Sequence, residues 1–469
     1  MASILRRLLR SSRRYKAETD KKSTTAVDES SLAKPSTTLV AAHQTKAAQS
    51  PSMASNSSQR PPSPARVFPT SGFHEFSKSH KVDEENYSWY SPKEFYPIRI
   101  GEVIQDRYQV ITKLGYGTAS TSWLCRDLNG HQYVAIKVYA SNQEQAQREI
   151  AAFKHLRKVL GDGSDAKELG GAQFIRLLHR SFELSHPKSS KKNLCLVYEP
   201  MGMTLADLRK IACEGQIPLE LLKPMLPFIL AALDFMHTKA NMVHTDIQEG
   251  NIMFSIEDEA ELKAVEEEEI AEPSARKIQK DNAVFMTRQV LAEVGNPKLI
   301  DLGEARFGQD KYAEHVMPDL YRAPEILLGL SWDSKIDIWA LGLMIWTAVE
   351  GENLFTDNNG GRWKSALPHM ARMVSLLGPP PQSLLDRSEE TKEFFDKNGQ
   401  LKKGQKLVET SLEEEENVLE GEEKTEFLRF IRCMLQWDPA DRPSAAELVN
   451  DPFLHTDPDE DEDEEEGGE

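Results

Sequence analysis

The central part of the chain predicts several strands followed by an amphipathic helix. An apolar run at 108–114 leads into a glycine-containing turn, and a second run at 134–136 ends at Lys137. Short apolar runs bounded by turn signals favour buried strands. Residues 141–160 then contain neither Gly nor Pro and carry apolar side chains at helical spacing, at Ile150, Phe153, Leu156 and Leu160. This second pattern predicts an α-helix.

The second half continues with further apolar segments. Residues 194–197 predict another strand, a short apolar stretch precedes Asp301, and residues 334–346 predict an apolar helix that begins near Asp337. Between these elements, residues 256–285 are strongly acidic and longer than a direct turn between strands requires. We expect them to form an exposed helical insert.

Both ends of the chain differ in composition from its middle. Residues 24–71 are dominated by Ser, Thr, Ala, Gln and Pro, and we expect a disordered tail over residues 1–86 because this composition has too little apolar surface to fold. Residues 457–469 carry ten acids. Blocks of like charge usually stay disordered and solvated, and an acidic tail that binds basic partners is the alternative.

The first residues have a composition of their own. Residues 1–17 contain five Arg, one Lys and no acid, and Leu5, Leu8 and Leu9 share one helical face. This composition fits a mitochondrial transit peptide, a basic nuclear signal or a charged tail. The three alternatives stay open at this point.

The segment His244–Asn251 (HTDIQEGN) places an acid and an amide five residues apart on one short loop. In the phosphotransfer loop H-R-D-L-x-x-x-N, the Asp accepts the proton of the substrate hydroxyl and the Asn holds a magnesium ion. Asp246 and Asn251 occupy those two positions. Downstream, Asp301 follows an apolar stretch and suits a second magnesium ligand.

The glycine turn upstream suits the phosphates of a nucleotide. Gly115 and Gly117 let backbone N–H groups approach phosphates, because a side chain would hold them away. A lone G-x-G is more often a hairpin turn, but here Lys137 follows in a VAIK strand and Glu149 lies on the next predicted helix. We expect Lys137 to pair with phosphates and with Glu149. The nucleotide-covering loop then consists of Leu114, Gly115, Tyr116, Gly117, Thr118, Ala119, Ser120, Thr121 and Ser122.

In their order, these motifs resemble those of eukaryotic protein kinases over about residues 87–453. The resemblance extends to Ala323-Pro324-Glu325 and to Arg442, the expected buried partner of Glu325. It implies an α+β fold with two lobes, a small β-rich lobe at 87–198 and a larger helical lobe at 199–455. It also implies ATP and Mg²⁺ as cofactors. Backbone groups of Glu199 and Met201 would bind adenine, with Tyr198 guarding the rear pocket.

Within that group the chain is similar to the SR-protein kinases. Thr245 replaces the usual Arg of the catalytic loop, the magnesium motif reads Asp-Leu-Gly, and residues 393–407 resemble a segment of the large lobe in that family. The resemblance implies transfer of the γ-phosphoryl of ATP to serines of basic, Arg/Ser-rich, mRNA-processing proteins. It also implies a place in cytoplasm and nucleus.

Several residues depart from the family pattern. Gln248 stands where most Ser/Thr kinases have a lysine that neutralises γ-phosphate charge, and Ser122 stands where a valine usually covers the adenine. A weakly active or inactive kinase-fold scaffold that binds basic partners is therefore the alternative function. A kinase-fold enzyme acting on a small molecule is disfavoured by the complete Pro-Glu activation segment. The expected docking acids of the family fall on Pro368 and Ser375, and Asp319 replaces an Arg.

The Thr245 substitution predicts a form of regulation. The usual Arg at this place is where a phosphorylated activation loop docks. Residues 302–324 contain no Ser or Thr, only Tyr312 and Tyr321 as hydroxyl residues. We therefore expect activity without phosphorylation of the activation segment.

Overall composition adds three limits. The net charge of −18 argues against a general nucleic-acid binder and suits basic protein substrates. No apolar run approaches the roughly 20 residues of a membrane span. The four cysteines form no C-x-x-C pair, which suits a reducing compartment and gives no zinc site. We expect a monomer.

Overall fold

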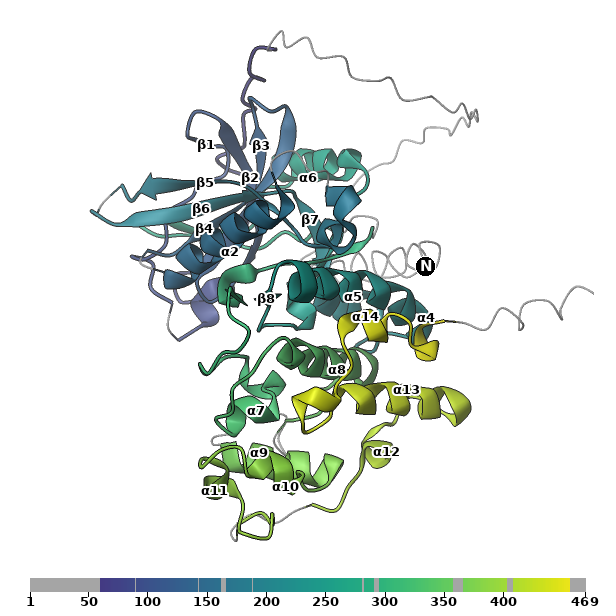
Figure 1. The fold of residues 1–469 in the computed structure, drawn as a ribbon. Coiled ribbons are helices and arrows are strands. Elements are labelled where there is room, and N and C mark those ends of the chain that lie inside the picture. Colours follow the sequence, from purple (N-terminus) through teal and green to yellow (C-terminus); the bar gives the residue numbers. More distant parts are fainter. Residues whose placement is uncertain are drawn as a thin grey trace, which may run out of the picture.

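A computed structural model of the protein describes residues 60–455, apart from positions 89, 142, 162–165, 188, 281, 291–294, 357–365 and 403–407. The chain folds into a small lobe dominated by one sheet and a larger helical lobe, which are stacked one above the other in Figure 1. This arrangement is the two-lobed α+β architecture that the sequence predicts. The Arg-rich start and the acidic tail lie outside the described residues.

The small lobe is built on an antiparallel sheet of six strands in the order β1-β2-β3-β4-β6-β5. Short turns join β2 to β3 and β3 to β4, whereas the connection from β4 to β5 contains a long helix, and β2, β3, β4 and β6 are largely buried. One long helix, α2 (Glu144–Leu160), packs on this lobe through Phe153 and Leu156. The strands are β1 (Val103–Ile104), β2 (Tyr108–Tyr116), β3 (Ser120–Asp127), β4 (Gln132–Tyr139), β5 (Leu178–Ser185) and β6 (Lys192–Tyr198).

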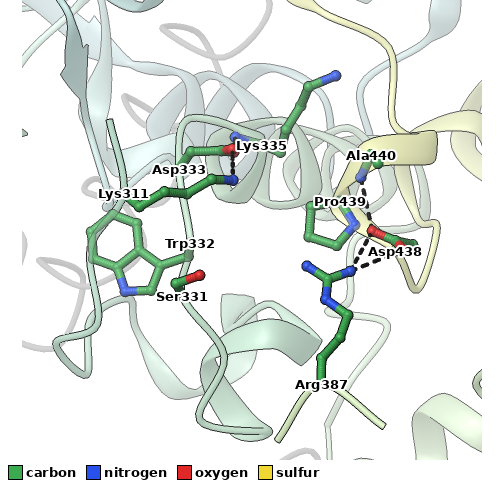
Figure 2. Close-up of a pocket in the computed structure, with 9 residues that line it drawn as sticks. All are labelled: Lys311, Ser331, Trp332, Asp333, Lys335, Arg387, Asp438, Pro439 and Ala440. Atoms are coloured by element: carbon green, nitrogen blue, oxygen red, sulfur yellow. Dashed lines mark hydrogen bonds and ion pairs between the residues drawn. The ribbon is translucent and has the colours of Figure 1, made fainter. Parts of the chain in front are cut away.

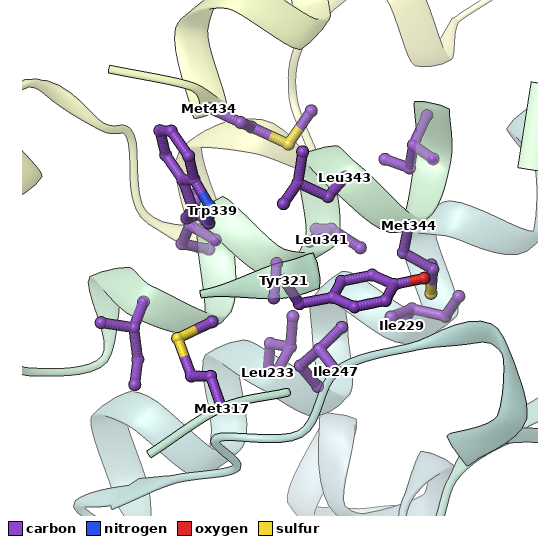
Figure 3. Packing of buried hydrophobic residues seen from close by; sticks show 14 of the residues in the cluster. Ile229, Leu233, Ile247, Met317, Tyr321, Trp339, Leu341, Leu343, Met344 and Met434 are labelled. Atoms are coloured by element: carbon purple, nitrogen blue, oxygen red, sulfur yellow. The ribbon is translucent and has the colours of Figure 1, made fainter. Parts of the chain in front are cut away.

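The large lobe is organised around helix α8 (Lys335–Glu350). Every residue from Ile336 to Val349 is buried, as expected for a helix that is apolar on all sides. Figure 3 shows Tyr321 among the side chains of Ile229 and Ile247, next to α8. The other helices are α3 (Leu205–Ala212), α4 (Leu219–Leu222), α5 (Leu226–Asp234), α7 (Pro324–Leu327), α9 (Ala366–Leu377), α10 (Gln382–Leu385), α11 (Thr391–Phe394), α12 (Leu412–Glu415), α13 (Gly421–Met434) and α14 (Ala445–Leu448).

Two small sheets hold the loops between the lobes. The strands β7 (Met201–Thr204), β9 (Ile252–Ser255) and β12 (Pro297–Leu299) pair in the order β12-β9-β7, and β8 (Met242–Val243) pairs with β13 (Arg306–Phe307). The catalytic loop runs from β8 to β9. Asp301 lies between β12 and β13. The antiparallel pairing therefore brings Asp246, Asn251 and Asp301 to one place at the base of the small lobe.

The prediction of a disordered tail over residues 1–86 is wrong for residues 60–86. Phe68 is buried in a cluster with Ile111 and Leu124 of the small-lobe sheet. Farther along, Asp83 and Glu84 form ion pairs with the fully buried Lys113. The Ser- and Pro-rich composition of this stretch conceals a few well-placed apolar and acidic side chains that attach it to the sheet.

The acidic segment 256–285 is helical, as predicted, but it is not exposed along its whole surface. Helix α6 (Glu259–Ala271) buries Leu262 and Val265 against the small lobe and lies beside β2 and β3 in Figure 1. Its Glu266 and Glu269 are also buried. Glu269 accepts from Thr112 Oγ1 at 3.0 Å. A hairpin of β10 (Arg276–Ile278) and β11 (Ala283–Phe285) completes the insert.

None of the helices within the described ranges is long and apolar enough to cross a membrane.

Candidate active site

The catalytic loop is anchored to the central helix of the large lobe through Asp337. The backbone N–H groups of His244 and Thr245 each donate to the Asp337 carboxylate at 2.8 Å. Asp337 is fully buried, and His237 Nε2 lies 2.9 Å from it. Charge-assisted bonds of this kind fix a loop more firmly than neutral ones. The loop that carries Asp246 is therefore rigidly attached to α8.

Asp246 is held by two neutral side-chain amides. Gln248 Nε2 donates to Asp246 Oδ1 at 2.7 Å, and Asn251 Nδ2 donates to Asp246 Oδ2 at 2.8 Å. Burial raises the pKa of Asp246 to about 6, although His244 and the two amides act in the opposite direction. A carboxylate with this pKa is ionised at neutral pH and lies close to the range suited to a proton acceptor.

Lys137 connects the small lobe to the magnesium motif. Its Nζ lies 3.1 Å from Glu149 Oε2 and 3.0 Å from Asp301 Oδ2. The predicted ion pair between Lys137 and Glu149 is therefore present. Burial disfavours the ammonium cation, but the two carboxylates outweigh it and raise the pKa of Lys137 above its ordinary value. The ammonium remains charged and is available to phosphate oxygens.

Asp301 adopts a backbone conformation that few side chains tolerate. Its φ is 63°, in the left-handed region, and its Oδ1 accepts from the Gly303 N–H at 3.2 Å. Such conformations cost about 1–3 kcal/mol and cluster at functional sites. Burial alone would raise the pKa of Asp301, but Lys137 and the Gly303 N–H outweigh burial and lower it. The carboxylate is thus kept ionised.

The oxygens near Asp301 suit a magnesium ion that is shared with a nucleotide. Asn251 uses its amide nitrogen for both of its bonds to Asp246, so its amide oxygen is the atom that could ligate. Within the described residues no group of three His, Cys, Asp or Glu forms a metal site by itself. Mg²⁺ usually takes one or two carboxylates plus substrate phosphates, so an incomplete protein site fits this ion.

The glycine loop is a hairpin over this site. Gly117 N–H donates to the Ser120 carbonyl at 2.9 Å and closes the turn between β2 and β3. A Cβ atom added at Gly115 or Gly117 would meet nothing within 4 Å, so the space beside both glycines is open. The sheet register places Ser122 opposite both Gly115 and Lys137. Leu114 and Tyr116 lie on β2, whereas Ala119, Ser120 and Thr121 are buried.

The hinge between the lobes carries a contact that the sequence does not predict. The carbonyl of Glu199 accepts two bonds from the Arg176 guanidinium, at 3.1 and 2.5 Å, and its side chain pairs with Lys298 at 2.7 Å. Adenine would have to share this carbonyl with Arg176. Met201 begins β7 and is buried. Binding of adenine by Glu199 and Met201 stays a prediction.

The activation segment is held in place by contacts within the protein. Thr245 Oγ1 donates to the Glu304 carbonyl at 2.7 Å, and the Tyr312 and Trp332 backbones pair with each other. Arg322 lies 3.0 Å from Asp319. The carboxylate of Asp319, which replaces an Arg of the family pattern, is thus engaged by its own segment.

The predicted ion pair between Glu325, at the end of the activation segment, and Arg442 is also confirmed. Arg442 Nη1 and Nη2 each lie 2.7 Å from an oxygen of Glu325, and both side chains are buried. This bidentate pair joins α7 to the loop after α13. Of the positions aligned with docking acids, Pro368 and Ser375 both lie on α9 and supply no carboxylate.

A separate cavity of about 170 Å³ lies in the large lobe, below the activation segment. Figure 2 shows Lys311 directed at Asp333 on one side and Arg387 directed at Asp438 on the other. These charges neutralise each other in pairs. The cavity lies apart from the catalytic loop and the glycine loop, and neither Asp246 nor Lys137 lines it.

Several contacts of the site were not foreseen from the sequence. Tyr139 and Tyr198 both donate their hydroxyls to Glu149, and Arg148 Nη2 lies 2.7 Å from Glu304 Oε1. The strand period would place Tyr139 on the same face as Lys137, but the distance to α2 is not a sequence property. No motif marks Arg148 or Glu304.

Comparisons with known proteins agree with this geometry. The family described as "Protein kinase domain" matches residues 108–454. A serine/threonine protein kinase of Aspergillus fumigatus is 37% identical over 399 residues, which is 84% of this chain and 96% of that protein. The serine/threonine-protein kinase SRPK of Physarum polycephalum is 29% identical over 405 residues, with 79% and 91% covered. SRSF protein kinase 3 of Mus musculus is 23% identical over 525 residues, with 80% and 91% covered.

Among solved structures, the crystal structure of a kinase domain aligns with a TM-score of 0.59 at 23% identity, over 77% of this chain and 99% of that one. At this identity the likeness shows the fold alone. The family match covers most of the chain and includes both the glycine loop and the catalytic loop. The chain therefore belongs to the protein kinase family, and its relatives are kinases of the serine/threonine type.

Proposed function

We propose that this serine/threonine protein kinase transfers the γ-phosphoryl group of Mg-ATP to serines in basic, Arg/Ser-rich proteins. The observation that carries the proposal is the convergence of Asp246, Asn251 and Asp301 beneath Lys137. A scaffold that only binds partners has no need for a base, two metal ligands and a phosphate-clamping cation in one place.

Each residue of the site would have a distinct role in the transfer. Asp246 would orient the serine hydroxyl and accept its proton, since Gln248 and Asn251 hold its two oxygens in a fixed direction. Asp301 and Asn251 would hold a magnesium ion, which neutralises phosphate charge when bound. Lys137 would pair with the α- and β-phosphates while Glu149 holds its ammonium.

The substrate class is inferred from relatives and from charge. The names of the Physarum and mouse kinases specify the SR-protein class. The net charge of −18 favours basic partners through long-range attraction. Pro368 and Ser375 stand where the SR-protein kinases have the acidic residues that dock the substrate. Recognition of arginine in this protein would therefore depend on other carboxylates. For the same class we propose action in cytoplasm and nucleus.

The activation segment supports turnover without phosphorylation. Residues 302–324 lack Ser and Thr, and Thr245 holds the Glu304 carbonyl with its hydroxyl. The place usually taken by a phosphate receptor is thus taken by a neutral contact within the protein. Protein made in bacteria and treated with phosphatase should therefore be as active as untreated protein.

The test is phosphoryl transfer from labelled Mg-ATP to three peptides of equal length: an Arg-Ser repeat, a Lys-Ser repeat and an Arg-Thr repeat. We expect fastest transfer to the Arg-Ser repeat, and no transfer by the Asp246→Asn variant. The Lys-Ser peptide has the same charge, so it separates recognition of guanidinium from simple attraction. The Arg-Thr peptide separates serine from threonine preference.

Other outcomes would change the proposal in different ways. Equal transfer to the Arg-Ser and Lys-Ser peptides would reject the Arg/Ser class but keep the kinase. No transfer to any peptide or to a generic basic protein, with ATP binding intact, would favour the scaffold instead.

A further inference from the structure

Glu149 has more hydrogen-bond donors than the lysine that the sequence assigned to it. Besides Lys137 at 3.1 Å, the Tyr198 hydroxyl donates to Glu149 Oε1 at 2.7 Å, and the Tyr139 hydroxyl donates to Oε2. Glu149 is only 2% exposed, and both tyrosines are buried. A buried carboxylate is costly unless several donors compensate it. Two phenols and one ammonium supply that compensation.

The register of the sheet explains why both tyrosines reach the same carboxylate. Tyr139 lies two residues after Lys137 on β4, so both side chains point to one face. Across the strand pair, Lys137 is opposite Leu196 of β6, and Tyr198 lies two residues beyond it. All three donors therefore face α2, which carries Glu149.

The two phenols act as neutral donors at ordinary pH. Burial, with the nearby Glu149 carboxylate, raises the pKa of both Tyr139 and Tyr198 well above its usual value. Packing alone does not require these hydroxyls, because a phenylalanine ring has the same shape. The Tyr198 ring also packs against Phe153 of α2, with ring centroids 5.9 Å apart.

A second attachment connects α2 to the activation segment. Arg148, next to Glu149, donates through Nε to the Gly303 carbonyl at 3.0 Å and pairs with Glu304 at 2.7 Å. The helix is thus held on one side by the two phenols and on the other by the magnesium motif. Neither attachment involves a phosphate.

We propose that Tyr139 and Tyr198 are positioning residues for phosphoryl transfer: their hydroxyls fix the Glu149 carboxylate so that α2 and Lys137 stay in the phosphate-binding arrangement without a phosphorylated activation segment. The inference rests on the proposed function. It gives both tyrosines a role that acts through Glu149 and that is separate from the rear-pocket position which the sequence assigns to Tyr198.

The test compares Tyr139→Phe, Tyr198→Phe and the double variant with wild type. Each substitution keeps the ring and removes one hydroxyl. We expect kcat to fall about ten-fold in the double variant, which corresponds to about 1.4 kcal/mol. The KM for the peptide substrate should not change, because the peptide does not contact α2 in this mechanism. Hydrogen exchange should show lower protection of the amides of residues 144–160.

Tyr133→Phe is the matched control. Tyr133 lies on the same strand and donates to the buried Glu266 at 2.7 Å, away from α2. It should have a similar effect on thermal stability and none on kcat or on exchange in α2. In a Glu149→Gln background, removal of both tyrosine hydroxyls should cause no further loss of kcat.

Three results would overturn the inference. They are an unchanged kcat with unchanged exchange in the double variant, an equal loss of kcat in Tyr133→Phe, and a further loss in the Glu149→Gln background. If wild type transferred no phosphate at all, the proposed function would fail. The exchange measurement would still decide whether the phenols hold α2.

Discussion

Gln248 donates its side-chain N–H to Asp246 Oδ1 at 2.7 Å. Most Ser/Thr kinases have a lysine at this position, and its ammonium pairs with the γ-phosphate. In this protein the position holds a neutral amide that donates to Asp246, the proton acceptor. Asn251 binds the other oxygen of the same carboxylate. The two amides fix the carboxylate plane but leave the developing phosphate charge to Lys137 and to the magnesium ion that Asn251 and Asp301 would hold.

Gln248→Ala should lower kcat by about 10- to 100-fold, because a hydrogen bond to a charged group contributes about 1.5–3 kcal/mol. Gln248→Lys should raise kcat above wild type, since an ammonium adds charge stabilisation that the amide lacks. Steady-state kinetics with a saturating peptide would measure both. Gln216→Ala, at an exposed position that donates to the Glu350 carbonyl, is the control. A Lys variant slower than wild type would show that orientation of Asp246 matters more than charge.

The pKa of Asp246, about 6, predicts how the activity depends on pH. The ionised carboxylate accepts the proton, so kcat/KM should fall as the pH drops through about 6. Gln248→Ala should move this acid limb to higher pH, because one donor to the ionised form is lost. Rates between pH 5 and 8, measured with a peptide that does not titrate in this range, would check the prediction. A rate that stays constant from pH 8 down to pH 5 would contradict it.

The same pKa predicts that this residue costs stability at neutral pH. Because burial raises the pKa of Asp246 from 3.8 to about 6 in the folded state, the folded protein binds more protons than the unfolded chain between these values. Its contribution is most favourable below pH 4 and is lost as the pH rises through about 6. Asp246→Asn should therefore abolish transfer yet stabilise the fold at pH 8 by up to about 2–3 kcal/mol.

Thermal unfolding at pH 8 and pH 5 would measure this gain, which should shrink at the lower pH. The exposed Asp310→Asn is the control and should change neither activity nor stability. Equal stability of Asp246→Asn and wild type at pH 8 would argue against the raised pKa.

The sequence predicted the residues of the site better than their partners. Lys137, Glu149 and Asp301 follow from motifs whose spacing reflects one strand, one helix and one loop, and their ion pairs are present in the structure. The hydroxyls of Tyr139 and Tyr198 could not be assigned to Glu149 from the sequence. That contact depends on the register between β4 and β6 and on where α2 packs, and both are set by long-range pairing.

The two predictions of exposure that were wrong, for residues 256–285 and for residues 60–86, failed because of long-range contacts as well. The acidic composition of 256–285 indicated a solvated helix, yet Glu269 is buried against Thr112 and Arg288. Thr112 is 157 residues away in sequence, so no local pattern could reveal it. Likewise, the apolar partners of Phe68, such as Ile111 and Leu124, lie on strands that are distant from it in the sequence. Composition predicts average exposure, whereas tertiary contacts determine which side chains of a polar segment are buried.

The pair of Arg148 and Glu304 should affect activity more than stability. Both side chains are more than one-third exposed, so the pair should contribute less than about 1 kcal/mol to folding. Because it joins α2 to the magnesium motif, Arg148→Met and Glu304→Gln should each lower kcat a few-fold, and together no more than either alone. A double-mutant cycle measures this coupling. Additive losses would show that the two side chains act independently.

The pair of Glu325 and Arg442 should affect stability more than activity, because both side chains are buried. Arg442→Met leaves an uncompensated carboxylate and should destabilise the large lobe by about 3–5 kcal/mol. Replacing both residues, as in Glu325→Leu with Arg442→Met, should cost less than the single change, since no charge is then left unpaired. Urea unfolding of the three variants would test this order.

The control for that series is Arg387→Met. Arg387 also pairs with a carboxylate, since its Nη1 donates to both oxygens of Asp438 at 3.1 and 3.0 Å, but its side chain is 43% exposed. Water can replace the lost partner there, so the loss should stay below about 1 kcal/mol. If Arg387→Met and Arg442→Met destabilised the protein equally, burial would not be the cause, and Glu325 would have to be stabilised by another donor when the guanidinium is removed.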